Sequence, residues 1–362
     1  MANSKSYRHN LSHKKSADIT LPIIVTATSL LALSYVWQYV ISKAANNDFA
    51  ATQFLYNTGS FLIKLIFPVL CSAIAYTIGS FDALISSIIG GMFVGFGSAT
   101  PYYTSVSDAV AGFWGCVIIG IIAGYTTLLF ERLRSNRHSF AISVISVLIP
   151  IMLVITSSDI LNLLSRNLNT LSASLIALAS KSSAIIAALL IGFMLNIDLY
   201  GPFHLAAYLF GAASVATGDP QYMACVASAV MVAPVSAGLY ELILYKSRSK
   251  KEIWVSVFSV LTGLAGVPQS AVYYYINHPV SKPAGCVAGG CISSVLCIVL
   301  GCSTQAVSGG FLSIGQMRNP VAFCISVICG VFSSVTIMIA LQGRQEAVST
   351  YKHRRYKKQP LV

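Results

Sequence analysis

Three ionisable residues lie within stretches of the sequence that are otherwise apolar: Lys64, Asp198 and His204. Charged groups are costly inside membrane segments, where they usually pair with one another or mark the path of an ion or solute. Their types suit recognition of a solute by charge and hydrogen bonding. They do not form the nucleophile and base pair that a bond-breaking site requires.

Each of these residues has a structural alternative to a functional role. Lys64 can extend along its helix to place the ammonium group at the membrane interface, pair with an acid such as Asp198, or contact an anionic solute. Asp198 can cap free backbone N–H groups at a helix break or face a solute. His204 can be a hydrogen-bonded histidine of the protein interior. The residues alone leave these alternatives open.

The sequence contains none of the common catalytic motifs. The glycines at 90–91 and 95–97 lack the Gly-Lys-Ser/Thr ending of a phosphate-binding loop, and no G-x-S-x-G or H-E-x-x-H pattern occurs. The nine cysteines lie in apolar stretches and show no zinc-binding spacing. We therefore expect no catalytic residue, no metal and no cofactor in this chain.

The elements that position these residues must be membrane helices. The chain has 362 residues, 56% hydrophobic and 9% charged, whereas soluble domains carry about 25% charged residues. Crossing a bilayer takes roughly 20 apolar residues in a helix. Candidate spans lie at about 20–43, 54–78, 83–98, 107–130, 138–156, 221–245, 252–276, 284–302 and 319–342.

Two further apolar stretches are interrupted and predict broken helices or re-entrant hairpins. The stretch 182–216 contains Gly201-Pro202 after Asp198, and the stretch 303–318 contains Gly309-Gly310. Non-helical backbone survives at membrane depth only when it is buried in protein or lines a cavity. We expect an all-α polytopic membrane protein with about nine or ten transmembrane helices, some of them broken. The segment 157–181 is expected outside the cytoplasm, lying flat at the membrane surface.

The basic residues cluster at the ends of the apolar runs. Of 23 Lys and Arg residues, 17 fall within 5–15, 132–137, 246–251 and 344–358. The net charge of +12 therefore reflects cytoplasmic loops and tails of a membrane protein rather than a nucleic-acid surface.

This distribution places both termini in the cytoplasm. We expect a basic N-terminal tail at 1–19, a transmembrane domain at 20–342 whose first helix is retained, and a basic C-terminal tail at 343–362. Within that domain, Gly120 and Gly124 form a G-x-x-x-G pair that would let a neighbouring helix approach closely.

Several motifs occur together in an order that resembles a known family. Residues 68–78 read P-V-L-C-S-A-I-A-Y-T-I, and 122–125 read I-A-G-Y. Residues 198–208 read D-L-Y-G-P-F-H-L-A-A-Y, and 231–234 read M-V-A-P. Leu300-Gly301-Cys302 is followed by the Gly309-Gly310 pair. Over roughly 60–340 the chain resembles the fructose-type membrane subunit IIC of the bacterial sugar phosphotransferase system, as a divergent member.

The departures from this family fall where a sugar would be recognised. The family's Asn-Lys pair is His204-Leu205 here, its Glu in the motif at 263–268 is Leu264, and its His before the glycine pair is Ser308. A carboxylate is a strong hydrogen-bond acceptor for a hydroxyl. The changes therefore imply a less polar site than the family's.

The resemblance implies a solute site near the bilayer midplane, at broken segments around 198–208, 262–269 and 305–310. Its polar candidates are Asp198, His204, Gln269 and Ser308. The turns that would shape it contain Gly201, Pro202, Gly309 and Gly310.

By this resemblance the chain would be the permease component of a phosphotransferase-type uptake system for a fructose-like sugar, in the bacterial cytoplasmic membrane. Separate IIA and IIB subunits would carry out the phosphoryl transfer, so this chain would perform no bond chemistry. Its other contacts would be membrane lipid, and a homodimer is left open. The alternatives are a carrier for another small solute, uncoupled from phosphorylation, and a membrane sensor or assembly protein that does not transport.

Overall fold

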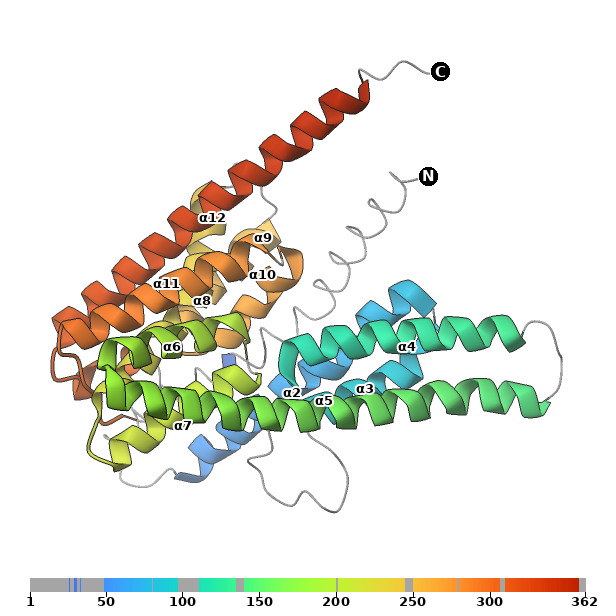
Figure 1. Cartoon of the computed structure of the whole chain (residues 1–362), viewed down its shortest axis with the longest axis horizontal. Coiled ribbons are helices and arrows are strands. Elements are labelled where there is room, and N and C mark those ends of the chain that lie inside the picture. Colours follow the sequence, from blue (N-terminus) through green and yellow to red (C-terminus); the bar gives the residue numbers. More distant parts are fainter. Residues whose placement is uncertain are drawn as a thin grey trace.

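The computed structural model of the chain is an assembly of helices (Figure 1). It describes residues 49–79, 81–96, 111–134, 140–199, 201–244, 250–278, 280–306 and 310–357, together with four isolated positions between 26 and 33. Helices satisfy all their backbone hydrogen bonds internally, which is what a segment in lipid requires. The expected first span at 20–43 lies almost entirely outside the described residues.

The helices are numbered as in Figure 1. The first half comprises α2 (Phe49–Gly79), α3 (Ala83–Phe96), α4 (Gly112–Arg134) and α5 (Phe140–Ser182). The second half comprises α6 (Ala184–Ile197), α7 (Pro202–Ala216), α8 (Gln221–Leu244), α9 (Lys250–Leu264), η2 (Pro268–Ala271), α10 (Val272–Asn277), α11 (Ser281–Val299), η3 (Phe311–Gln316) and α12 (Pro320–Lys357).

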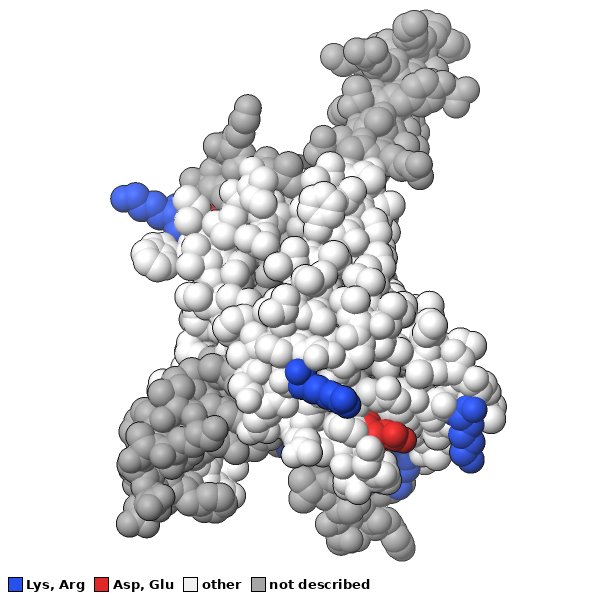
Figure 2. All heavy atoms as spheres, turned by 90° about the vertical axis from the view of Figure 1, so that its left-hand side faces the viewer, with Lys and Arg blue, Asp and Glu red and all other residues white. Residues whose placement is uncertain are grey.

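Six of the described helices are long and apolar enough to cross a membrane. Their apolar stretches are Gln53–Gly79, Gly112–Phe130, Val147–Ser182, Gln221–Ile243, Ser281–Val299 and Pro320–Gln342. Four shorter apolar helices, α3, α6, α7 and α9, add to them. The protein is therefore an all-α polytopic membrane protein, as its composition predicts. Figure 2 agrees, because few charged side chains appear among the described atoms on the face that it shows.

Helix α5 runs along both halves of the molecule. It packs against α3 and α4 at one end and against α6 and α7 at the other (Figure 1). The sequence predicted a span at 138–156 and a separate segment at the membrane surface over 157–181. That prediction is wrong for the described structure, which has one helix of 43 residues. No Gly or Pro follows Pro150 in this stretch, so nothing ends the helix before Ser182.

Helices in the first half approach closely through glycines. A Cβ on Gly120 would touch Ile74 and the Cys71 carbonyl of α2, and a Cβ on Gly124 would overlap Ile78. The G-x-x-x-G pair thus faces α2, as small residues at a helix contact do.

The second half is built around α8 and α11. In the 18-residue window of α8 that qualifies it as a membrane span, 94% of the residues are buried. Helix α11 packs against α6, α8 and α12. Gly289 of α11 and Gly330 of α12 each lie against the other's carbonyl oxygen, so these two backbones nearly touch. Helix α12 continues to Lys357, past the expected end of the membrane domain at 342.

Candidate functional site

The first break in the second half separates α6 from α7. Helix α6 ends at Ile197, Asp198 follows in an extended conformation, and α7 begins at Pro202. Proline at the first position of a helix is favoured because its missing N–H has no partner there. The sequence prediction of a broken helix at this place is therefore confirmed.

Asp198 is folded back over the turn that follows it. Its side chain is 3% exposed, and a Cβ on Gly201 would overlap its carboxylate. The backbone N–H of Phe203, in the first turn of α7, lies beside the same carboxylate. Its Oδ1 atom is buried without a hydrogen-bond partner. Asp198 thus faces the protein interior with one oxygen next to the start of α7 and one oxygen available.

His204 closes the break from the α7 side. Its Nδ1 lies 3.0 Å from the carbonyl oxygen of Leu195, in the last turn of α6. A carbonyl can only accept, so Nδ1 carries the proton. His204 is 8% exposed, and its bond to the Leu195 carbonyl is that of a hydrogen-bonded interior histidine, one of the alternatives that the sequence leaves open.

Two further side chains donate hydrogen bonds to the last two carbonyl groups of α6. The Tyr275 hydroxyl, on α10, donates to the carbonyl of Asn196 at 2.6 Å. The Trp114 indole N–H, on α4, donates to the carbonyl of Ile197 at 3.3 Å. The last four carbonyls of a helix have no partner within it. The end of α6 is thus held by donors from three separate elements.

A second break lies between α9 and α10. Gly266 has φ +84°, a conformation that glycine adopts readily and other residues rarely do. Pro268 then starts the short helix η2. The predicted continuous span at 252–276 is therefore wrong, and the predicted break at 262–269 is confirmed. Gln269 lies in η2, 8% exposed, and its Oε1 is buried without a donor.

Leu264 stands where the family has Glu, and the residues around it are apolar as well. Leu264, the last residue of α9, packs against a buried cluster that includes Met231 and Val235 of α8. The described structure thus gives this position no polar role.

The third segment is a loop closed by its own backbone. Thr304 and Met317 form an antiparallel bridge, and the Arg318 N–H donates to the Ser303 carbonyl at 2.9 Å. Gly310 has φ +98°, and a Cβ there would overlap the backbone of Ala265 and Gly266. The loop therefore rests directly on the second break. Ser308 and Gly309 lie outside the described residues.

The first and second breaks are linked by Tyr275, which follows the second break and bonds the helix end before the first. Leu199 lies in one buried cluster with Val267 and Ala271. Tyr275 bonds the end of α6 and is near enough to Asp198 to interact with it electrostatically. The three segments that the sequence singled out are therefore neighbours. Among the candidate polar groups, Asp198 and Gln269 each present a buried oxygen that lacks a donor.

Lys64 does not join this group in the described structure. Its ammonium group lies 5.7 Å from the centre of the Phe96 ring, at a distance typical of a cation–π contact. The alternative in which Lys64 pairs with Asp198 is not observed.

Sequence reasoning missed Tyr275, Trp114 and the buried lysine Lys282. Lys282 is 0% exposed and lies 2.9 Å from Glu241. In the sequence it stands beside Pro283, just before an apolar run, where a lysine ordinarily marks a loop. A spacing pattern cannot show which distant side chains reach a helix end or a buried ammonium group.

The comparisons with known proteins agree with the resemblance in the sequence. No family model matches the chain. It is 25% identical over 316 residues to a protein of Escherichia coli (strain K12) named fructose-like permease IIC component 2, covering 86% of this chain and 84% of that protein. It is 24% identical over 340 residues to a protein of Haloferax volcanii named PTS system fructose-specific EIIC component, covering 90% of each.

A longer relative shows the same region joined to others. The chain is 22% identical over 341 residues to a Bacillus subtilis protein named PTS system fructose-specific EIIABC component. The match covers 90% of this chain and 50% of that protein.

Proposed function

Since the chain is a divergent relative of fructose-type IIC components, we propose that it is the membrane permease component of a phosphotransferase-type sugar uptake system. The solute is a fructose-like sugar. It binds where the breaks at Asp198–Gly201 and Gly266–Pro268 meet, and it passes to a separate IIB subunit at the cytoplasmic face. The membrane is the cytoplasmic membrane of a bacterium, with both termini inside.

The observation that carries this proposal is the pair of buried acceptor oxygens on Asp198 and Gln269. Buried polar atoms are nearly always hydrogen-bonded, and each exception calls for an explanation. A sugar presents several hydroxyl donors in a small volume. Solute sites of carriers also lie at broken helices near the midplane. A polyol bound between the two breaks would supply the donors that the protein does not.

The names of the relatives support the choice of partners. The Bacillus subtilis relative is named as an EIIABC component, and a further Escherichia coli relative is named as a fructose-like EIIBC component. The first name joins A and B to C, and the second joins B to C. For this chain we propose IIA and IIB as separate subunits that perform the phosphoryl transfer. The chain itself then needs no catalytic residue and no cofactor.

A second candidate function has one specific observation in its favour. Leu264 stands where the family has Glu, and it packs into an apolar cluster. A site that lacks this carboxylate loses a strong acceptor for a sugar hydroxyl. The second candidate is therefore a carrier for another small solute, no longer coupled to phosphorylation.

Uptake of radiolabelled fructose by cells with and without the gene tests the proposal. The labelled solute is extracted and separated into free and phosphorylated sugar. Accumulation of sugar phosphate that depends on both this gene and the IIB gene supports the first candidate. Accumulation of free solute, unaffected by removal of IIB, supports the second. If fructose, mannose and a hexitol all enter cells at the same rate with and without the gene, the proposal of a sugar permease is refuted.

A further inference from the structure

Asp198 carries a buried carboxylate that no cationic side chain accompanies. It is 3% exposed, and its Oδ1 atom has no hydrogen-bond partner. His204 directs Nδ1 at the Leu195 carbonyl instead, and among the residues that the structure describes no ion pair reaches Asp198. Burying a charge is costly unless an opposite charge and hydrogen bonds compensate for it. The site therefore presents a negative charge that the protein leaves without a counter-ion.

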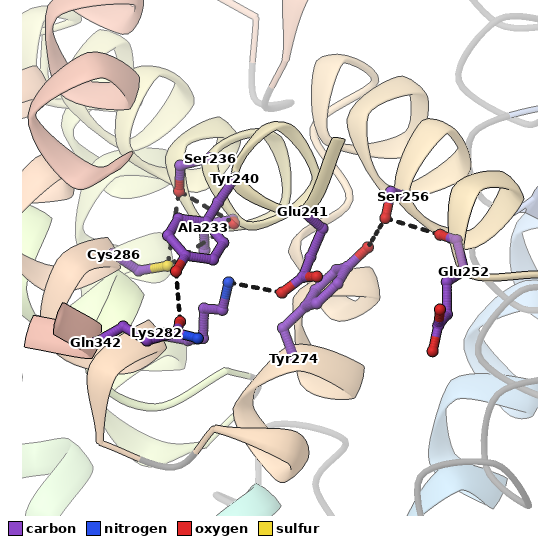
Figure 3. A network of polar contacts seen from close by, with 10 residues as sticks. All are labelled: Ala233, Ser236, Tyr240, Glu241, Glu252, Ser256, Tyr274, Lys282, Cys286 and Gln342. Carbon is purple, nitrogen blue, oxygen red and sulfur yellow. Dashed lines mark hydrogen bonds and ion pairs between the residues drawn. The ribbon is translucent and has the colours of Figure 1, made fainter. Parts of the chain in front are cut away.

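Two lysines of the membrane helices are engaged away from this carboxylate. The ammonium nitrogen of Lys282 lies 2.9 Å from Glu241 Oε1 and 3.2 Å from the centre of the Tyr240 ring (Figure 3). The ammonium nitrogen of Lys64 lies 5.7 Å from the centre of the Phe96 ring. Each of these lysines thus has a favourable contact of its own, an ion pair with a ring in the first case and a ring alone in the second.

Two departures from the family motifs change the charge of the site. Leu205, in the first turn of α7, stands where the family has Lys. Leu264, at the end of α9, stands where it has Glu. The first removes a positive charge seven positions after Asp198, and the second removes a carboxylate. Asp198 is thereby the one acid among the candidate polar groups of the site, and a neutral sugar would leave it without a counter-ion.

A second acceptor lies at the neighbouring break. Gln269 is 8% exposed, and its Oε1 atom is buried without a donor. Tyr275, six positions later, bonds the carbonyl of Asn196, two positions before Asp198. A carboxylate and an amide carbonyl only accept hydrogen bonds. The solute that suits these two oxygens supplies donors, and the donor at the carboxylate carries a positive charge.

We infer that the solute is an amino sugar, in which a protonated amine takes the place of a hydroxyl group. The ammonium group pairs with the Asp198 carboxylate, and a hydroxyl group donates to Gln269 Oε1. A hydrogen bond that involves an ionised group is roughly twice as strong as one between neutral groups. This inference deepens the proposed function and rests on it, because it takes the region of the two breaks as a sugar site.

Calorimetric titration of the purified protein in detergent compares amino sugars with their parent sugars. The pairs are 1-amino-1-deoxyfructose with fructose and glucosamine with glucose, at about pH 6, below the pKa of an alkyl amine. In at least one pair the amino sugar should bind on the order of tenfold more tightly than its parent. N-acetylation of that amino sugar removes the charge and should abolish the preference.

Two matched variants test whether the preference comes from Asp198. Asp198→Asn keeps the shape of the side chain and removes its charge, so the ratio of the two dissociation constants should fall to about one. Asp159→Asn is the control. The Asp159 carboxylate also has a buried oxygen without a partner, but it belongs to the continuous helix α5, outside the candidate site. This variant should keep the wild-type ratio.

The outcomes separate this inference from the proposed function. If each parent sugar binds as tightly as its amino derivative, the inference is overturned and the sugar permease stands. An Asp198→Asn protein that retains the full preference would also overturn it. If that variant does not fold, the N-acetyl derivative decides on the wild-type protein, because equal binding of the charged and uncharged forms overturns the inference. Binding of none of these sugars would count against the proposed function, and the inference would fall with it.

Discussion

Gly201 is the residue on which the first break depends most directly. A side chain there would occupy the space of the Asp198 carboxylate. We expect Gly201→Ala to lower the free energy of unfolding by about 1–3 kcal/mol, the usual effect of overpacking a buried site. The measurement is thermal unfolding of the purified protein in detergent.

Gly315 provides the matched control for Gly201. It lies in η3 with nothing within 4 Å of the place where a Cβ would stand. Gly315→Ala should change stability by no more than about 0.5 kcal/mol. Equal melting temperatures for the two variants would show that the Asp198 carboxylate is not held against Gly201.

Gln269 and His204 are expected to matter for uptake in different ways. Gln269→Ala removes a buried acceptor that a sugar hydroxyl would use, so the half-saturating fructose concentration should rise roughly tenfold or more. His204→Ala should impair uptake as well, because it also releases the Leu195 carbonyl at the end of α6. Tight, stereospecific fructose uptake by both variants would place the sugar elsewhere.

For single residues, the sequence predicts those whose effect depends only on their neighbours in the chain. Asp198, Gly201 and Pro202 stand next to one another, and proline and glycine break helices wherever they occur. Tyr275 and Trp114 were not predicted, because each reaches the end of α6 from a helix far away in the sequence. Lys282 was missed for the same reason: its partner Glu241 lies 41 positions away.

The end of α6 is an element that depends on donors from outside itself. Tyr275→Phe removes the hydroxyl that donates to Asn196 and leaves a buried carbonyl without a partner. We expect a loss of about 1–3 kcal/mol in the free energy of unfolding. Tyr125→Phe is the control, because that side chain is 60% exposed on α4 and should alter stability by less than about 0.5 kcal/mol. Equal effects of the two changes would argue against the proposed capping.

The prediction of elements succeeded or failed for physical reasons. Helices separated by polar loops, such as α2 and α8, were placed to within a few residues, since the change of composition marks their ends. The boundary between 156 and 157 was wrong because polar residues alone do not end a helix that packs on neighbours at both ends. The break inside 252–276 was predicted only from the family motif. Gly266 and Pro268 are two residues in a long apolar run, so the composition of the run alone indicates a continuous helix.

For the whole molecule, the charge pattern predicts an orientation. Both termini and the loops at 131–137 and 246–251 should face the cytoplasm, because cytoplasmic loops carry the excess of Lys and Arg. A cysteine introduced as Ser135→Cys, in a variant without the native cysteines, should react with a maleimide that cannot cross membranes only after the cells are opened. Labelling of intact cells would contradict this orientation.

The length of α5 has a consequence for the lipid around the protein. Its candidate membrane span of 36 residues extends about 54 Å at 1.5 Å per residue, whereas the hydrocarbon core of a bilayer is roughly 30 Å thick. If the whole span lay in hydrocarbon, the helix would lean by roughly 55°, more than the range of about 0–40° that is usual.

A thicker bilayer would let α5 stand more upright. Because α5 packs against α3 and α4 at one end and α6 and α7 at the other, its tilt is shared with both halves of the molecule. We therefore expect the rate of solute uptake in reconstituted vesicles to pass through an optimum as the acyl chains are lengthened from about 14 to about 22 carbons, because a thicker bilayer reduces the mismatch with α5. An uptake rate independent of acyl-chain length would mean that the thickness of the membrane does not change the tilt of α5 in a way that affects transport.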